Sequence, residues 1–204
     1  MYDVELEGIF NNYAATFVKE PDFCIRFYEE NELKLSSSVW FDADSLLKYE
    51  TIAGWYLWAL LQNKKHSKAV QKGKAIVSIV EKNIQNLKID PANDAYYHAL
   101  INQTAIAKHF RYMYRPAFKD FTLLLQYEPQ NKDYKLWADM SKYRSYNILL
   151  YCIAFLIIVG NGYCKKYLSQ PIAIATPIIG LVCVCYAMWF EVKARRIWKA
   201  AKTH

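Results

Sequence analysis

Two long runs without a charged side chain constrain this chain more than any other feature of its sequence. The first run extends from Ser145 to Cys164 and the second from Tyr167 to Phe190. Because an α-helix rises about 1.5 Å per residue, about 20 residues cross a hydrocarbon core of about 30 Å. Both runs are long enough, and they predict two membrane-spanning helices, at about 145–164 and 169–190. Neither run contains Asp, Glu, Lys, Arg or His, so we expect no proton or ion relay in them.

The net charge of +7 is concentrated around these runs. The segment 141–204 contains nine Lys or Arg and one acid, whereas the segment 1–140 contains 17 bases and 18 acids. Nine basic residues flank the outer ends of the two runs, against two in the connecting turn. This asymmetry predicts a two-span integral membrane protein with its N- and C-termini in the cytosol. It also explains the positive charge without a nucleic-acid partner, and we expect none.

The chain thus divides into a cytosolic α-helical domain over 1–143, a transmembrane hairpin over 144–192 and a basic cytosolic tail over 193–204. Thr176 and Gly180 form a pair of small residues that lets another helix approach closely. That helix is either the first span or a span of a second copy, which leaves a homo-oligomer open. Aromatic and basic residues near the span ends predict anchors at the membrane interface; these are Tyr146, Tyr163, Tyr167, Trp189, Trp198, Arg195 and Arg196.

The segment 1–143 predicts helices only. Apolar residues recur at three- and four-residue spacing over about 1–20, from Pro21 onward, and over 44–63, 67–87, 92–110, 116–127 and 132–143. We expect Asp42 or Asp44 to cap the third helix and Ser67 to cap the fourth. The serine-rich segment 34–41 predicts a loop. No glycine or proline interrupts 132–159, so the last of these helices is expected to continue into the first span.

A pattern of small and aromatic residues marks the segment from His98 to Tyr143. Ala105, Tyr114, Ala117, Phe121 and Pro129 follow one another at the positions expected of a helix–turn–helix unit. This segment resembles a tetratricopeptide repeat followed by its capping helix. One aromatic of the pattern is missing, because Lys108 occupies its place.

The pair of predicted helices at 44–63 and 67–87 resembles a second, more divergent unit. Ala69 matches the pattern, but Gly73 replaces the aromatic and Glu81 replaces the proline. The resemblance implies an all-α domain of stacked helix pairs with a concave groove that binds a protein partner or a neighbouring subunit. Candidate groove residues on the first helices of the pairs are Tyr56, Tyr97, Asn102 and Lys108.

The motifs of common catalytic sites are absent from the sequence. It contains no glycine-rich phosphate loop, no Gly-x-Ser-x-Gly, no His-Glu-x-x-His and no cysteine or histidine cluster at zinc spacing. We therefore expect neither an enzyme nor a cofactor. The leading hypothesis is an adaptor that binds a protein at the cytosolic face of a bilayer. One alternative is a membrane-perturbing effector whose hairpin oligomerises on a signal sensed by the helical domain. Another is an accessory subunit of a larger membrane complex.

Overall fold

The computed structural model describes residues 4–37, 42–164 and 170–201. Every regular element in these ranges is a helix. The chain separates into two compact units, Met1–Gln130 and Asn131–His204, which we call the helical domain and the hairpin unit. The segment 131–143, which the sequence prediction assigned to the cytosolic domain, groups with the hairpin.

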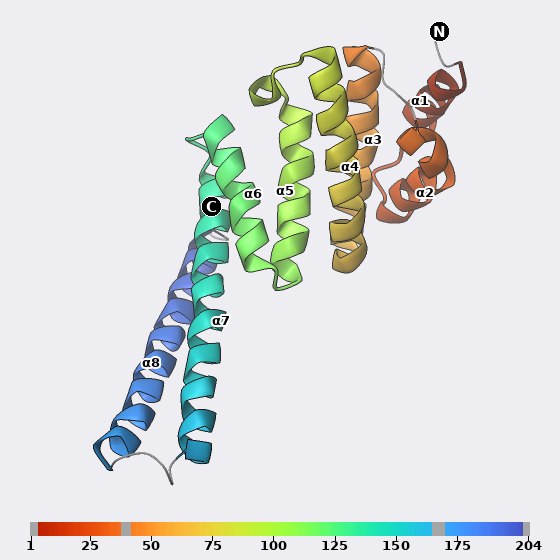
Figure 1. Cartoon of the computed structure of the whole chain (residues 1–204). Helices are drawn as coiled ribbons and strands as arrows, with labels where there is room; N and C mark the ends of the chain where they lie inside the picture. Colours follow the sequence, from red (N-terminus) through yellow and green to blue (C-terminus); the bar gives the residue numbers. More distant parts are fainter. Residues whose placement is uncertain (1–3, 38–41, 165–169, 202–204) are drawn as a thin grey trace. The chain divides into compact units, whose positions relative to one another are not determined.

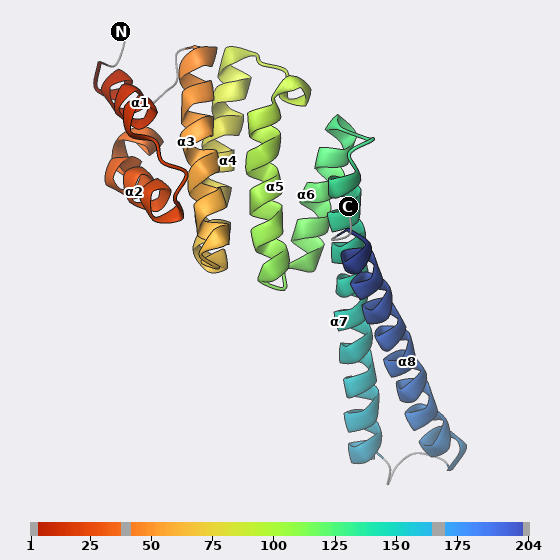
Figure 2. The ribbon, with the colours of Figure 1, turned by 180° about the vertical axis from the view of Figure 1, so that it is seen from behind.

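The helical domain is a stack of helices (Figures 1 and 2). Helix α3 packs against α2, α4 and α5, and α5 packs against α4 and α6. The two central helices of the domain are therefore α3 and α5. The elements are α1 (Val4–Thr16), α2 (Pro21–Ser37), α3 (Ala43–Gln62), α4 (His66–Leu87), the 3₁₀ turn η1 (Pro91–Asn93), α5 (Ala95–Phe110) and α6 (Tyr114–Tyr127).

The caps predicted from the sequence are present at some helix starts and absent at others. Asp42 caps α3, because its side chain accepts a hydrogen bond from the Ser45 amide at 2.7 Å. The predicted cap at Ser67 is wrong: α4 begins at His66, and the preceding residue makes no capping bond through its side chain. The predicted loop at 34–41 is wrong over 34–37, where α2 continues to Ser37. Leu35 is completely buried there, so apolar burial outweighs the turn preference of the serines.

The α3–α4 and α5–α6 connections have the same structure. Each has three residues, 63–65 and 111–113, and each has a left-handed residue at its centre, Lys64 (φ 54°) and Tyr112 (φ 61°). The three amides of each turn donate to carbonyls four, three and five residues earlier, in that order. The same three-residue turn therefore occurs twice in the helical domain. The interval from Lys64 to Tyr112 is longer than the period of a tetratricopeptide repeat, which is about 34 residues.

Gly73 brings α4 close to α5. A Cβ atom at this position would lie 2.3 Å from Oγ1 of Thr104, on α5, far inside van der Waals contact. The Thr104 side chain is buried, and its hydroxyl donates to the Leu100 carbonyl. The departure from the aromatic pattern at Gly73 thus has a packing reason, since even a Cβ atom there would overlap the Thr104 side chain.

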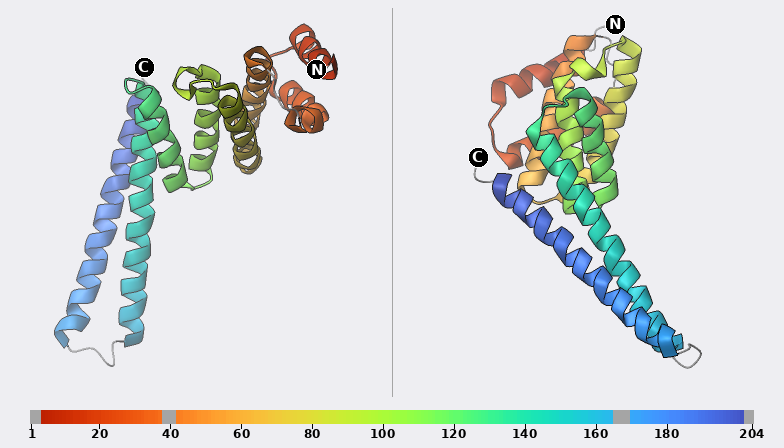
Figure 3. Two further views of the ribbon diagram at one scale, coloured as in Figure 1. Left: turned by 45° about the horizontal axis from the view of Figure 1, so that its top comes forward. Right: turned by 90° about the vertical axis from the view of Figure 1, so that its left-hand side faces the viewer.

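The hairpin unit consists of two long antiparallel helices, α7 (Lys132–Cys164) and α8 (Gln170–Ala201), which lie side by side (Figure 3). Small buried residues at their contact, Ala154 and Ala187, allow close packing. The hairpin register is set by contacts along the two helices: Trp137 with Trp198, Asn147 with Glu191, and Gly180 with Ile157 and Ile158.

Most of the apolar surface of the hairpin is uncovered. Two stretches, Lys132–Gly160 and Ala175–Lys199, are long and apolar enough to cross a membrane, and only 11% of the most apolar window of each is buried. A core helix of a water-soluble domain would bury such residues. The large exposed side chains include Leu149, Phe155, Leu156, Ile158, Ile178, Leu181, Met188 and Trp189.

Candidate partner-binding cleft

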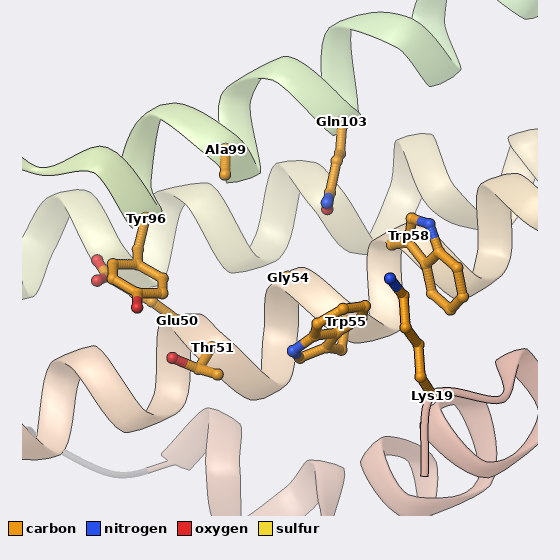
Figure 4. A pocket seen from close by; sticks show the side chains of 9 residues that line it. All are labelled: Lys19, Glu50, Thr51, Gly54, Trp55, Trp58, Tyr96, Ala99 and Gln103. Carbon is orange, nitrogen blue, oxygen red and sulfur yellow. The ribbon is translucent and has the colours of Figure 1, made fainter. Parts of the chain in front are cut away.

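A cleft of about 320 Å³ opens on one face of α3 and α5. Its lining comes from three segments that are distant in the sequence. Helix α3 supplies residues at intervals of about one turn, and α5 supplies a second row (Figure 4). The segment between α1 and α2 supplies Lys19. The lining residues are Lys19, Glu50, Thr51, Gly54, Trp55, Trp58, Tyr96, Ala99 and Gln103.

Aromatic rings and one ammonium group form one side of the cleft. Trp55 and Trp58 meet edge to face, with ring centroids 5.3 Å apart. The Lys19 ammonium lies 5.4 Å from the ring of Trp55 and 6.0 Å from that of Trp58, within the range of a cation–π interaction. Phe17 packs on Trp55 at 5.1 Å. These contacts hold both indole rings in place beside the hollow.

Glu50 is the carboxylate among the residues that line this cleft. It is 2% exposed, and its Oε1 atom accepts no hydrogen bond from the described residues. Burial, then the negative charge of Asp94 and a hydrogen bond between the two carboxyl groups, raise the pKa of Glu50 to about 8. Asp94 itself caps α5 by accepting from the amides of Tyr96 and Tyr97. Glu50 is therefore mainly protonated at neutral pH, and an added positive charge nearby would favour its ionised form.

Gln103 reaches into the cleft from α5 (Figure 4). Its Oε1 atom is buried and has no donor among the described residues. Gly54, on α3, leaves the centre of the hollow open, because a Cβ atom there would meet nothing within 4 Å. A second hollow of about 460 Å³ also borders Glu50 and Tyr96 and adds Asp90 and Asp94. The region is therefore concave, aromatic and rich in acceptor oxygens.

The four predicted groove residues lie on these same two helices but do not line the cleft. Tyr56 is fully buried and stacks on Tyr28 at 4.1 Å. Tyr97 donates to Glu81 of α4 at 2.9 Å. These contacts direct the two side chains toward neighbouring helices, and their role in partner binding stays a prediction.

The other two groove predictions also fall outside the cleft. Lys108 pairs with Asp120 of α6 at 2.5 Å. Asn102 is half-buried, and its Oδ1 has no donor within the described parts of the chain. The sequence analysis missed the cleft residues because α3 is apolar on nearly all sides from Ile52 onward. The signal in the sequence is that Glu50, Gly54 and Trp58 follow one another at intervals of four residues, which places them on the same face of α3.

One member of the predicted packing pair, Gly180, contacts the other helix of the hairpin. Gly180 is buried against α7 of the same chain, where a Cβ atom would lie 3.4 Å from Cγ1 of Ile158. Thr176 is half-buried, one turn before Gly180. A homo-oligomer through this position stays a prediction.

The predicted interface anchors lie mostly at the charged end of the hairpin. Tyr146 and Trp189 are exposed. Trp198 contacts Trp137 at 5.5 Å. Arg195 donates to Glu191 at 3.0 Å, and Arg196 is exposed. The side chain of Tyr163 and the whole of Tyr167 lie outside the described residues.

A polar cluster joins the two helices at the same end. The Asn147 amide donates to Oε2 of Glu191 at 3.1 Å, and Arg195 donates to Oε1 of the same carboxylate. The Lys193 ammonium lies 4.7 Å from the ring of Tyr143 and 5.0 Å from that of Trp189. Sequence analysis did not predict this cluster, because its members come from opposite ends of the hairpin sequence and resemble ordinary flanking charges.

No group of His, Cys, Asp and Glu in the described parts of the chain has the arrangement of a metal site. Comparison with models of protein families, with curated proteins and with solved structures found no match to this chain. The structure therefore defines a class only coarsely: an all-α protein with a helical domain and two helices long and apolar enough to span a membrane.

Proposed function

We propose that this protein is a membrane-anchored helical-repeat adaptor that binds a protein partner through the α3–α5 cleft. The main support is the cleft itself: an open, aromatic hollow in which the buried Oε1 atoms of Glu50 and Gln103 have no donors among the described residues. Such groups carry a cost when left unpaired, about 1–3 kcal/mol each, and a bound partner removes that cost. The repeated helix pairs supply a rigid frame for it.

The uncovered hairpin supports the membrane part of the proposal. Exposed apolar side chains on α7 and α8 have a natural environment in a lipid bilayer. Most charges of the hairpin unit gather at one end, around Arg144 and Glu191, where interfacial groups are expected. We further propose that both termini lie in the cytosol. A Tyr167→Cys variant in a cysteine-free chain should react with an impermeant maleimide from outside intact cells; labelling only after the cells are opened would contradict this topology.

The adaptor role is testable with two glycine variants. Gly54→Leu fills the cleft without a clash at Cβ, because a Cβ atom there meets nothing within 4 Å. Gly8→Leu is the matched control, since Gly8 also lies inside a helix with open space around it. Full-length chains are purified from cells in mild detergent and the bound proteins identified by mass spectrometry. A partner that is kept by Gly8→Leu and lost with Gly54→Leu supports the proposal. Identical sets of bound proteins for the unsubstituted chain and both variants refute it.

The membrane-perturbing alternative has one supporting feature. Helix α7 runs without a break from Lys132 to Cys164, so a movement at its start would be carried into the apolar part. The absence of ionisable Asp, Glu, Lys, Arg and His side chains from both uncharged runs argues against a water-filled pore. Expression with a membrane-potential dye separates the two functions: collapse of the potential favours the effector, and an unchanged potential with cleft-dependent partner binding favours the adaptor.

A further inference from the structure

One end of the helical domain is strongly basic. The α3–α4 and α5–α6 turns both lie at this end of the stack, opposite the α4–α5 connection (Figure 1). His66, just after the first turn, stacks on Phe110, just before the second, at 4.8 Å, so the two turns are neighbours. The surrounding segments 62–68 and 109–116 contain five Lys or Arg and no Asp or Glu. We call this surface the basic end; its cations are Lys64, Lys65, Lys68, Arg111 and Arg115.

Most of these charges are not compensated by carboxylates. Lys68 pairs with Glu29 of α2 at 2.7 Å. The other four are exposed and make no salt bridge with the residues that the structure describes. Asp22 borders the same end, where it accepts a hydrogen bond from Asn63 at 3.0 Å. The positive charges of the two turns also act on one residue between them: after burial, Arg111 and then Lys64 lower the pKa of His66.

Helix stability alone does not explain where these cations lie. Positive charge is favourable at the C-termini of α3 and α5, which are at this end, but unfavourable at the N-termini of α4 and α6, which are at the same end. In the described structure neither N-terminus has a capping side chain or an acid in its first turn. Yet Lys65 directly precedes α4, and Arg115 lies in the first turn of α6. Local choices that oppose stability are expected where a surface has a function.

Aromatic rings accompany the cations at the basic end. Tyr112, the left-handed residue at the centre of its turn, is 73% exposed, and Phe110 is 44% exposed. Large rings next to Lys and Arg are typical of the level of lipid headgroups, where the ring meets the acyl boundary and the cation meets phosphate. The basic end therefore combines the two kinds of side chain that bind an anionic membrane surface.

We propose that the basic end docks on the anionic lipid headgroups of the bilayer in which the hairpin is anchored. The inference rests on the proposed membrane anchoring: the hairpin keeps the domain close to a bilayer, so docking occurs within one chain at a high effective concentration. The cytosolic leaflet carries anionic lipids, which attract Lys and Arg near the surface. A nucleic acid or an acidic protein is not held beside the domain in this way. None of the residues that line the α3–α5 cleft belongs to the basic end, so a docked domain still presents the cleft to a partner.

The test uses the full-length chain in nanodiscs that contain a lipid with a nitroxide quencher on its headgroup. A fluorophore is attached to Ser67→Cys, an exposed position in the basic end, in a cysteine-free chain. The nanodiscs are made of phosphatidylcholine alone or with about one third phosphatidylglycerol, which supplies the anionic surface. We expect stronger quenching in the anionic nanodiscs. The difference should disappear between about 0.1 M and about 1 M salt, because the Debye length falls from about 10 Å to about 3 Å.

A second reporter position tests which end of the domain docks. Ala92→Cys places the same fluorophore on an exposed residue of η1, in the α4–α5 connection at the opposite end of the stack. Phosphatidylglycerol should change its quenching much less than it changes that of the Ser67→Cys reporter. Equal changes at both positions would contradict docking by the basic end.

Two triple variants with the same change of charge test the cations. Lys64→Gln, Lys65→Gln and Arg111→Gln together should lower the equilibrium constant for surface contact about 100-fold, since each removes one favourable charge at the lipid surface. The control triple makes the same changes at exposed positions outside the basic end and should leave the contact nearly unaltered; it combines Arg26→Gln, Lys82→Gln and Lys88→Gln.

A third variant tests the aromatic part of the surface. Tyr112→Asn suits the left-handed backbone at this position and removes the exposed ring. It should weaken the contact about five-fold at low and high salt alike, because burial of a ring at the interface is not screened by ions. An unaltered contact in Tyr112→Asn would contradict a lipid surface as the ligand.

Three further results would overturn the inference. They are equal quenching of the Ser67→Cys reporter with and without phosphatidylglycerol, equal effects of the two triple variants, and saturable binding of polyglutamate or single-stranded DNA at the basic end in place of lipid contact. These failures are separable from failure of the proposed function. If the domain does not approach the lipid while Gly54→Leu loses a partner, the anchored adaptor stands and the docking is wrong. If the domain docks but no partner depends on the cleft, the docking stands and the adaptor role is wrong. A chain that does not insert into nanodiscs refutes the anchoring and the docking together.

Discussion

The two helix-interior glycines of the central stack should respond to alanine with opposite signs. Gly54 lies in α3 and Gly73 in α4. Alanine is more favourable than glycine inside a helix by about 0.8–1 kcal/mol. Since a Cβ atom at Gly54 meets nothing within 4 Å, Gly54→Ala should raise the free energy of unfolding by about 0.5–1 kcal/mol.

At Gly73 the same substitution meets a neighbour. The new Cβ atom would lie 2.3 Å from Oγ1 and 3.0 Å from Cγ2 of Thr104. Overpacking a buried site costs about 1–3 kcal/mol. We expect the upper end of that range, because Thr104 is 3% exposed and its hydroxyl is held by the Leu100 carbonyl. After the helical gain is subtracted, Gly73→Ala should lower the free energy of unfolding by about 1–2 kcal/mol.

Hydrogen exchange of peptides from α4 and α5, in the full-length chain in micelles, measures this change directly. A loss of about 1.4 kcal/mol corresponds to about ten-fold faster exchange of the most protected amides. Thr104→Ala removes the two nearest atoms and should restore part of the protection, whereas Thr104→Ser keeps the hydroxyl and should not. If Gly73→Ala protects α4 as well as Gly54→Ala protects α3, the close approach of α4 and α5 is wrong.

Three further predictions concern buried polar groups. The pKa of Glu50 is raised from 4.5 to about 8, so its contribution to stability is complete below pH 4.5 and is lost as the pH rises through 8. Urea titrations should give a free energy of unfolding that is lower at alkaline than at acidic pH, by on the order of 3 kcal/mol, and Glu50→Gln should remove this difference. Equal stability at both pH values would contradict the burial of this carboxyl. His98→Phe should keep the ring stacking on Tyr127 and lose the polar contacts of the two ring nitrogens, with Oε1 of Glu128 at 2.9 Å and with the Pro91 carbonyl at 2.8 Å. We expect a loss of about 2–3 kcal/mol and faster hydrogen exchange at the end of α6, and unchanged exchange there would argue against the contact. Asn147→Leu leaves one carboxylate oxygen of Glu191 without this donor, so the two helices should separate more easily at that end, as measured by electron paramagnetic resonance between spin labels on α7 and α8. An unaltered distance distribution would refute that role.

The hairpin helices were predictable because their signal is local. An uncharged run of about 20 residues is long enough to cross a bilayer, where a helix satisfies every backbone group within itself. The extension of α7 back to Lys132 was predictable in the same way, because no glycine or proline interrupts that part of the helix. What could not be predicted is the register, which depends on side chains far apart in the sequence, such as Asn147 and Glu191.

The small and aromatic residues at 105, 117 and 121 indicated buried positions correctly. Ala105, Ala117 and Phe121 are all fully buried, as small and aromatic positions of a helix pair should be. Gly73 departs from the pattern because the Thr104 side chain lies against it. The loop predicted at 34–41 failed over 34–37 because serine preferences are weak beside the burial of Leu35.

By itself, the sequence determined that the chain is helical and that two of its helices are apolar enough to span a membrane. Both properties depend on composition and spacing within one segment. Only the tertiary structure decided which side of α3 is open, since the helix is apolar on nearly all sides and its neighbours choose the face. Packing against α2 buries Tyr56. Helix α5 lies beside the opposite part of α3, and Glu50, Trp55 and Trp58 line the cleft between them. Non-local packing, which no single segment encodes, therefore placed the candidate site.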